Sequence, residues 1–166
     1  SQRAIIIGAL ANQNISISGF LNGEDPLSTL SALNQIGADI SINDNRVNIK
    51  KREIPFSNSS NSIDLGNSGT GMRLMMGLIA GIGLKAKLIG DESLMKRPMS
   101  RVSIPLNEMG ANISNSDGLP PIEIKSREIR GDYFYDMPIA SAQVKSSILL
   151  AGVASNTKVS IFEPSI

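Results

Sequence analysis

An internal repeat constrains the fold of this chain more than any other feature of its sequence. Residues 33–40, LNQIGADI, recur as residues 106–113, LNEMGANI, with five identical positions and an offset of 73 residues. Upstream of each copy stands a proline, Pro26 or Pro98, which we expect at the first position of an amphipathic helix. A long fixed period indicates a repeated supersecondary unit.

Each unit is predicted to contain a nearly all-apolar helix, a strand, an amphipathic helix and two short strands. The amphipathic helix should end at Gly37 in the first copy and at Gly110 in the second, where glycine accepts a left-handed backbone. Residues 43–45 and 116–118 carry the turn residues of hairpins. The predicted helices are 4–11, 26–36, 72–82, 98–109 and 144–154, and the predicted strands are 15–18, 39–42, 46–50, 62–65, 85–89, 112–114, 122–125 and 158–162.

The whole chain, residues 1–166, is expected to form a single lobe of a larger protein. It lacks an initiator Met and stops just after a predicted strand, so we interpret it as a piece of a longer chain. Segments 53–61 and 126–138, rich in Ser, Asn, Pro and charge, are predicted linkers. The repeat units then cover about residues 1–55, 62–130 and 138–166, with the third unit truncated.

The apolar helices indicate how the units pack. A helix that is apolar on all sides must be buried, so three such helices are expected inside, with sheets and amphipathic helices outside. All three begin with small or polar residues, at 1–3, 67–70 and 141–143. If related units aim these helices the same way, their N-termini converge and form a strong anion site. The simpler alternative is that these residues only cap their helices.

The run 66–73, GNSGTGMR, is the strongest local indication of such a site. It lies between a predicted strand and a buried helix, where the first backbone N–H groups of the helix are unpaired. Unpaired donors and the positive end of the helix dipole attract anions, and glycine lets a ligand approach the backbone. The alternative is an ordinary glycine-rich turn.

Composition limits the chemistry that this chain can perform. It has no Cys and no His, which excludes disulfides, thiolate chemistry and the commonest metal ligands. The net charge is only +1 and no long basic run occurs, so nucleic acid is a poor candidate partner. The longest apolar run, about 74–84, is too short to span a bilayer, and no signal peptide is evident.

Three segments, taken together, carry a resemblance to a known family. Residues 66–73, the segment Lys96-Arg97-Pro98-Met99 and residues 141–146, SAQVKS, resemble the 5-enolpyruvylshikimate-3-phosphate synthase family, in its class II spelling. The resemblance implies an α/β (α+β) fold of repeated βαβαββ units, with buried helices and outer mixed sheets. It further implies that this chain is most of the lobe that holds shikimate-3-phosphate in a two-lobe enzyme.

The resemblance also implies a reaction. Enzymes of the family transfer the enolpyruvyl group of phosphoenolpyruvate to the 5-hydroxyl of shikimate-3-phosphate and release phosphate, with no metal or organic cofactor. The expected partners are these two substrates and the second lobe, without nucleic acid or membrane, in a cytoplasmic monomer of aromatic amino acid biosynthesis that glyphosate inhibits. The Lys and first Ser of the family motif K-S-x-S-x-R are absent here. By the family pattern the proton-transfer groups belong to the other lobe, so the isolated chain is expected to bind shikimate-3-phosphate weakly and to be inactive.

Individual site residues follow from the same resemblance. Those implied for shikimate-3-phosphate are Arg3, Ser141, Ala142 and Gln143. Those implied for phosphoenolpyruvate are Asn67, Gly69, Thr70, Arg97 and again Gln143, with Lys145 as a further candidate. Arg73 is expected to support the glycine-rich loop, and capping is expected for the acidic pairs Glu24-Asp25 and Asp91-Glu92. Tyr133 and Tyr135 are expected to be packing residues within a linker.

Three alternatives stay open at this point. A UDP-N-acetylglucosamine enolpyruvyl transferase would share fold and chemistry, although its usual loop cysteine is missing here. A non-catalytic anion-binding module would bind simple phosphates without preferring shikimate-3-phosphate. A structural repeat protein would bind no ligand at residues such as Arg3 or Arg97.

Overall fold

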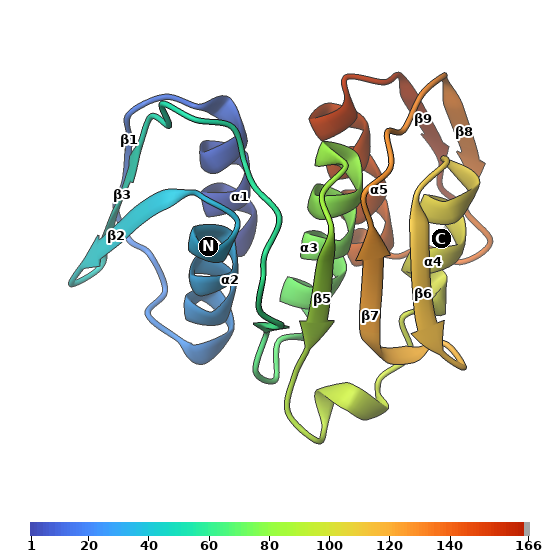
Figure 1. Ribbon diagram of the computed structural model, residues 1–166, viewed down its shortest axis with the longest axis horizontal. Coiled ribbons are helices and arrows are strands. Elements are labelled where there is room, and N and C mark those ends of the chain that lie inside the picture. The colour runs from blue at the N-terminus through green and yellow to red at the C-terminus, as the bar shows by residue number, and fades with distance from the viewer. Residues whose placement is uncertain (165–166) are drawn as a thin grey trace.

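The computed structural model describes residues 1–164 and confirms an α/β fold (Figure 1). Its α-helices are α1 (Gln2–Ala11), α2 (Glu24–Gln35), α3 (Gly69–Ile82), α4 (Ser100–Glu108) and α5 (Ala142–Ser155), with a short 3₁₀ helix, η1, at Leu94–Lys96. Its strands are β1 (Ile15–Ile17), β2 (Asp39–Asn43), β3 (Arg46–Lys50), β4 (Ile63–Asp64), β5 (Ala86–Ile89), β6 (Asn112–Ser116), β7 (Leu119–Lys125), β8 (Tyr133–Asp136) and β9 (Val159–Phe162). No helix among these residues is long and apolar enough to cross a membrane.

The predicted repeat is confirmed by the order of the elements. The middle unit, β4-α3-β5-α4-β6-β7, shows the full βαβαββ pattern. The first unit has the same order without its leading strand, and the third comprises β8-α5-β9. Each helix between β4 and β5, or between β8 and β9, is the crossover that two parallel strands require.

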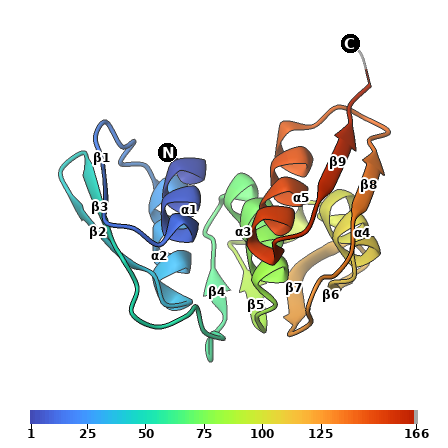
Figure 2. The ribbon, with the colours of Figure 1, turned by 90° about the horizontal axis from the view of Figure 1, so that it is seen from above.

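The sheets repeat as well. In the first unit the strand order is β1-β3-β2, all antiparallel, and in the second it is β4-β5-β7-β6. Strands β5, β7 and β6 therefore take the places of β1, β3 and β2, while β4 adds a parallel edge strand. The first sheet lies at one end of the molecule and the β8–β9 pair at the other, with the helices between them (Figures 1 and 2).

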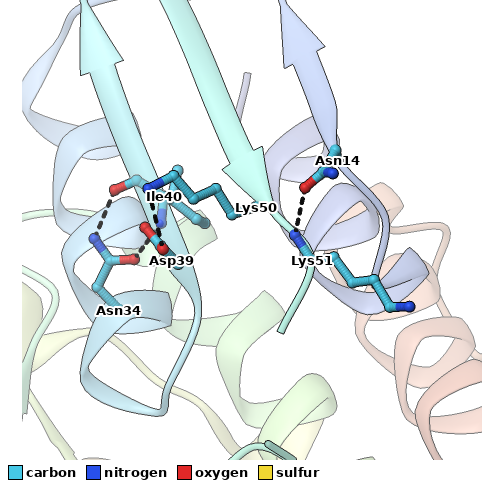
Figure 3. A network of polar contacts seen from close by, with 6 residues as sticks. All are labelled: Asn14, Asn34, Asp39, Ile40, Lys50 and Lys51. Atoms are coloured by element: carbon cyan, nitrogen blue, oxygen red, sulfur yellow. Dashed lines mark hydrogen bonds and ion pairs between the residues drawn. The ribbon is translucent and has the colours of Figure 1, made fainter. Parts of the chain in front are cut away.

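A side-chain contact at the end of each amphipathic helix recurs at the repeat offset. Asn34 donates to the carbonyl of Ile40 at 2.9 Å and accepts from its N–H at 3.0 Å, as Figure 3 shows. Asn107 makes the same pair of bonds to Ile113, at 2.9 and 2.8 Å. Gly37 and Gly110 follow these helices with φ of 102° and 109°, so the predicted glycine stops are confirmed.

The prolines do not stand where the sequence predicts. Helix α2 begins two residues before Pro26, with Glu24 and Asp25 in its first turn. Proline is tolerated at this position because the N–H that it lacks would have no partner in the first turn of a helix. Helix α4 begins two residues after Pro98, with Met99 at its N-cap. The prediction of proline at the first helical position was wrong in both cases.

The segment 126–138 is not a linker throughout, because it contains strand β8. Tyr133 and Tyr135 alternate with an exposed Phe134, a period-2 pattern of β-forming aromatic residues that composition alone conceals. The two tyrosine rings stack with centroids 6.1 Å apart and pack on the core, which confirms their packing role. The Tyr133 hydroxyl donates to Glu108 on α4 at 2.7 Å.

Helix α3 lies between α1 and α5 (Figure 2) and is buried along most of its length. Glycines bring it against α5: a Cβ on Gly77 would stand 2.1 Å from the Ser147 carbonyl oxygen. The prediction of complete burial was wrong for α1 and α5. Ile7 on α1 is 57% exposed and Val153 on α5 is 69% exposed, because neither helix is covered on the side that faces the other.

Candidate anion-binding site at three helix starts

Side chains tie the start of α1 to the start of α3. Gln2 Nε2 donates to the Ser68 hydroxyl at 2.7 Å and to the Thr29 hydroxyl at 2.9 Å. Ser68 is the N-cap of α3 and accepts from the N–H of Gly71 at 3.0 Å. Both hydroxyl residues are fully buried, so the contact fixes the two helix starts against each other.

The starts of α3 and α5 are joined through Gln143. Its Nε2 donates to the Thr70 hydroxyl at 2.9 Å, and its Oε1 accepts from Arg73 Nη1 at 2.8 Å. Thr70 is in the first turn of α3 and Arg73 is in the next, so both face the first turn of α5.

The third pair of helix starts is joined by Arg3. Its Nε donates to the Ser146 hydroxyl at 3.0 Å and its Nη2 to the Ala142 carbonyl at 3.4 Å. The starts of α1, α3 and α5 thus contact one another in all three pairs. The predicted convergence of the three helix N-termini is confirmed.

This junction offers backbone donors to an anion. Within residues 1–164, no protein partner is found for the N–H groups of Thr70, Ala142 and Gln143. Ser141 caps α5 by accepting from the N–H of Val144 at 3.4 Å, which leaves the two preceding N–H groups free. Free N–H groups at the positive ends of helices attract phosphate and carboxylate groups.

Arg97 is held beside the glycine-rich loop by Asn67. Its Nη2 donates to Asn67 Oδ1 at 2.6 Å and its Nη1 to the Asn67 carbonyl at 3.2 Å. Asn67 Nδ2 in turn donates to Asp91 Oδ2 at 2.7 Å. Hydrogen bonds, first from the Leu94 backbone and then from Asn67, lower the pKa of Asp91, so this carboxylate stays charged and holds the loop. Asp91 does not cap the helix that follows Pro98: its side chain accepts from the N–H of Leu94, at the start of η1, at 2.7 Å.

The arginines next to this loop repel one another. Burial lowers the pKa of the Arg73 guanidinium below its ordinary value, and the charges of Arg97 and Arg101 lower it further. Gly69 packs beneath two of them: a Cβ there would lie 3.1 Å from Arg73 Nη1 and 3.2 Å from Arg97 Nη1. A bound anion would relieve this repulsion.

Lys145 and Asn67, two of the predicted site residues, are bound to acidic side chains of this chain. Lys145 forms an ion pair with Glu163, and both side chains are about one-third exposed, so part of its charge is balanced. Asn67 uses both ends of its amide, toward Arg97 and Asp91. The sequence reasoning missed Arg101 and the buried bonds of Gln2. Arg101 lies within the predicted helix 98–109 but Arg97 precedes it, so a helical spacing could not indicate that the two charges lie close together.

Comparison with known proteins identifies the family. The family model described as EPSP synthase (3-phosphoshikimate 1-carboxyvinyltransferase) matches residues 1–166. The chain belongs to the EPSP synthase family. An EPSP synthase structure from Acinetobacter baumannii superposes with a TM-score of 0.90 at 39% identity, covering 99% of this chain and 38% of the other.

Sequence relatives in the EPSP synthase family agree. A 3-phosphoshikimate 1-carboxyvinyltransferase from Thermoanaerobacter sp. (strain X514) is 42% identical over 165 residues, covering 99% of this chain. One from Legionella pneumophila (strain Lens) is 46% identical over 173 residues, covering 100% of this chain. The chain spans 39% of the length of each of these relatives.

Proposed function

We propose that this chain forms the shikimate-3-phosphate side of the active site in a longer enzyme, a 3-phosphoshikimate 1-carboxyvinyltransferase. The enzyme would transfer the enolpyruvyl group of phosphoenolpyruvate to the 5-hydroxyl of shikimate-3-phosphate, within the shikimate pathway of aromatic amino acid biosynthesis. Membership of the EPSP synthase family supports this activity. The main structural support for the position of the site is the junction of three helix starts, with Arg3 and Arg97 beside it.

The proposed roles match groups on both substrates. The free N–H groups at the start of α5, with Ser141 and Arg3, suit the phosphate of shikimate-3-phosphate, while Gln143 suits a ring hydroxyl. Arg97, Thr70 and the backbone at Gly69 and Asn67 suit the carboxylate and phosphate of phosphoenolpyruvate. Lys145 remains a weaker candidate because Glu163 pairs with it.

The reaction is addition followed by elimination. In the addition, the 5-hydroxyl loses its proton as its oxygen bonds to the enol carbon of phosphoenolpyruvate, and the methylene carbon of phosphoenolpyruvate gains a proton to become a methyl group. In the elimination, that methyl group loses a proton and the C–O bond to phosphate breaks, which releases phosphate. Positive groups stabilise the charge that develops on the departing phosphate. The proton-transfer groups are assigned to the second lobe, whose closure would align the substrates and exclude water.

The remaining parts of the proposal concern the whole protein. This chain would be one lobe with two nearly complete repeat units and the opening of a third, and the lobe would be completed by further chain. The enzyme is proposed to be a cytoplasmic monomer. Alone, the chain would bind shikimate-3-phosphate weakly and catalyse no transfer.

A calorimetric titration of the chain with shikimate-3-phosphate tests this function. Binding is expected, and Arg3→Ala should weaken it about tenfold or more because one charge-assisted contact is lost. Arg127→Ala is the matched control: Arg127 is an exposed arginine whose backbone lies against the far end of α3. Equal affinity for inorganic phosphate and shikimate-3-phosphate would instead favour a simple anion-binding module.

A further inference from the structure

Arg73 connects three segments of the junction, although the resemblance assigns it no substrate. Its Nη1 donates to Gln143 Oε1 at 2.8 Å and to the Gly69 carbonyl at 3.3 Å. Its Nη2 donates to the Pro98 carbonyl at 3.1 Å, directly after Arg97. The half-buried guanidinium of Arg73 therefore contacts three segments: the start of α3, Gln143 in the first turn of α5, and the segment that carries Arg97.

The contact with Arg73 decides which way the Gln143 amide points. A guanidinium can only donate hydrogen bonds, so the amide oxygen must face it and the amide nitrogen must face away. Nε2 then donates one of its two protons to the Thr70 hydroxyl, 2.9 Å away, and its other proton is available for a further hydrogen bond. A flipped amide would set two donors against each other at 2.8 Å.

We propose that Arg73 is a positioning residue that locks Gln143 as a hydrogen-bond donor toward the substrate. The inference rests on the proposed function and adds which hydrogen-bonding group of the substrate Gln143 recognises. In this orientation the group that Gln143 offers to the substrate is the remaining Nε2 proton, so Gln143 recognises a substrate oxygen that accepts, such as the oxygen of a ring hydroxyl. Arg73 itself donates three of its five N–H groups to protein acceptors, and we place its effect on the substrate in its contact with Gln143.

A test without ligand examines the contact itself. In the nitrogen-labelled chain, the side-chain NH₂ signals of Gln143 should differ from those of Gln35, an exposed glutamine at the end of α2. Arg73→Met should move the Gln143 signals toward the Gln35 values, whereas Arg73→Lys should preserve much of the difference because an ammonium also donates to Oε1. Unchanged Gln143 signals in Arg73→Met would overturn the proposal.

The same contact can be examined from the other side if Arg73→Met does not fold. Gln143→Met leaves Arg73 with both of its carbonyl acceptors, so the fold has less reason to fail. The guanidinium signals of Arg73 should shift in this variant and those of Arg127 should not. Arg73 signals identical to those of the parent chain would also overturn the proposal.

A double-mutant cycle on shikimate-3-phosphate binding tests the consequence for recognition. Arg73→Met and Gln143→Met should each weaken binding about tenfold, the usual worth of one hydrogen bond. If Arg73 acts through Gln143, the double variant should also lose about tenfold, rather than the roughly hundredfold loss of two independent contacts. Additive losses would show that Arg73 acts independently of Gln143 and would overturn the proposal.

Failure of this inference can be told apart from failure of the proposed function. A parent chain that does not bind shikimate-3-phosphate contradicts the function but leaves the ligand-free signals of Gln143 to decide the role of Arg73. A parent chain that binds, with signals indifferent to Arg73→Met, contradicts only the positioning role.

Discussion

A methyl group on Gly69 would be crowded by two arginines of the site. A Cβ there would stand 3.1 Å from Arg73 Nη1 and 3.2 Å from Arg97 Nη1, so one or both guanidiniums must move by a few tenths of an ångström. Since Arg97 is the residue assigned to phosphoenolpyruvate, the methyl group acts on that side of the site. The start of α5, proposed for the other substrate, is joined to this loop through Gln143, which bonds to Arg73 and Thr70.

Gly69→Ala is therefore expected to separate the two substrates in the complete enzyme. The KM for phosphoenolpyruvate and the inhibition constant of glyphosate should both rise several-fold, while the KM for shikimate-3-phosphate changes less. Steady-state kinetics would measure all three, with Gly23→Ala as the control because its Cβ meets only ordinary contacts at 3.8 and 3.9 Å. Equal inhibition of the parent and Gly69→Ala enzymes by glyphosate would contradict the expectation.

At the residue scale, the sequence predicted which helix starts would converge better than how their junction is held together. Ser141 and Gly69 stand in short motifs at the starts of α5 and α3, and local sequence is sufficient to indicate such helix starts. The bonds of Gln2 to Ser68 and Thr29 join residues 66 and 27 positions apart. Such contacts exist only once the units pack, so no local pattern could predict them.

At the scale of elements, the repeat predicts that equivalent residues in the two units contribute equally to the free energy of unfolding. Asn34→Ala and Asn107→Ala each remove two hydrogen bonds to one backbone residue and leave its N–H and carbonyl to find new partners. Each should lower the free energy of unfolding by about 2 kcal/mol. Urea unfolding would measure both, with Asn48→Ala on the exposed face of β3 as the control. Costs that differ by more than twofold would show that the two units are not energetically equivalent.

The contact of α3 with α5 is a second feature of this scale. A Cβ on Gly77 would lie 2.1 Å from the Ser147 carbonyl oxygen, and one on Gly81 would lie 2.6 Å from the Ala151 carbonyl oxygen. Overpacking against backbone should destabilise Gly77→Ala by about 3 kcal/mol and Gly81→Ala by somewhat less. Thermal unfolding of both variants, beside Gly23→Ala, would check this order. A Gly77→Ala chain as stable as Gly23→Ala would show that the helices can separate at no cost.

The existence of helices and strands was more predictable than their limits. The helix periods, the glycine stops and the hairpin turns are local signals, and the elements they predicted are present. The helix starts predicted from Pro26 and Pro98 were wrong by two residues each, because proline is compatible with several positions around a helix start. Strand β8 was missed because a strand of four residues depends on its parallel partner β9, which lies beyond helix α5.

At the scale of the whole molecule, one of three equivalent grooves is open. Helix α2 packs against α1 and α3, and helix α4 packs against α3 and α5, so each amphipathic helix covers a pair of apolar helices. The remaining pair, α5 and α1, borders a cavity of about 470 Å³. Ile7, Leu149 and Val153 line it and are 57%, 43% and 69% exposed. The repeat predicts that the amphipathic helix of a completed third unit covers this groove in the longer enzyme.

Ile7→Ser tests that prediction, because its effect should depend on whether the groove is covered. In the chain alone, a change at this exposed position should alter the free energy of unfolding by less than about 0.5 kcal/mol. In the complete enzyme, where the third helix would bury the side chain, the same change should cost about 2 kcal/mol. Ile104 on α4 is equally exposed, at 57%, but lies outside the groove, so Ile104→Ser should be nearly neutral in both proteins. Equal, small effects of Ile7→Ser in the two proteins would mean that the groove stays open and that the third unit packs elsewhere.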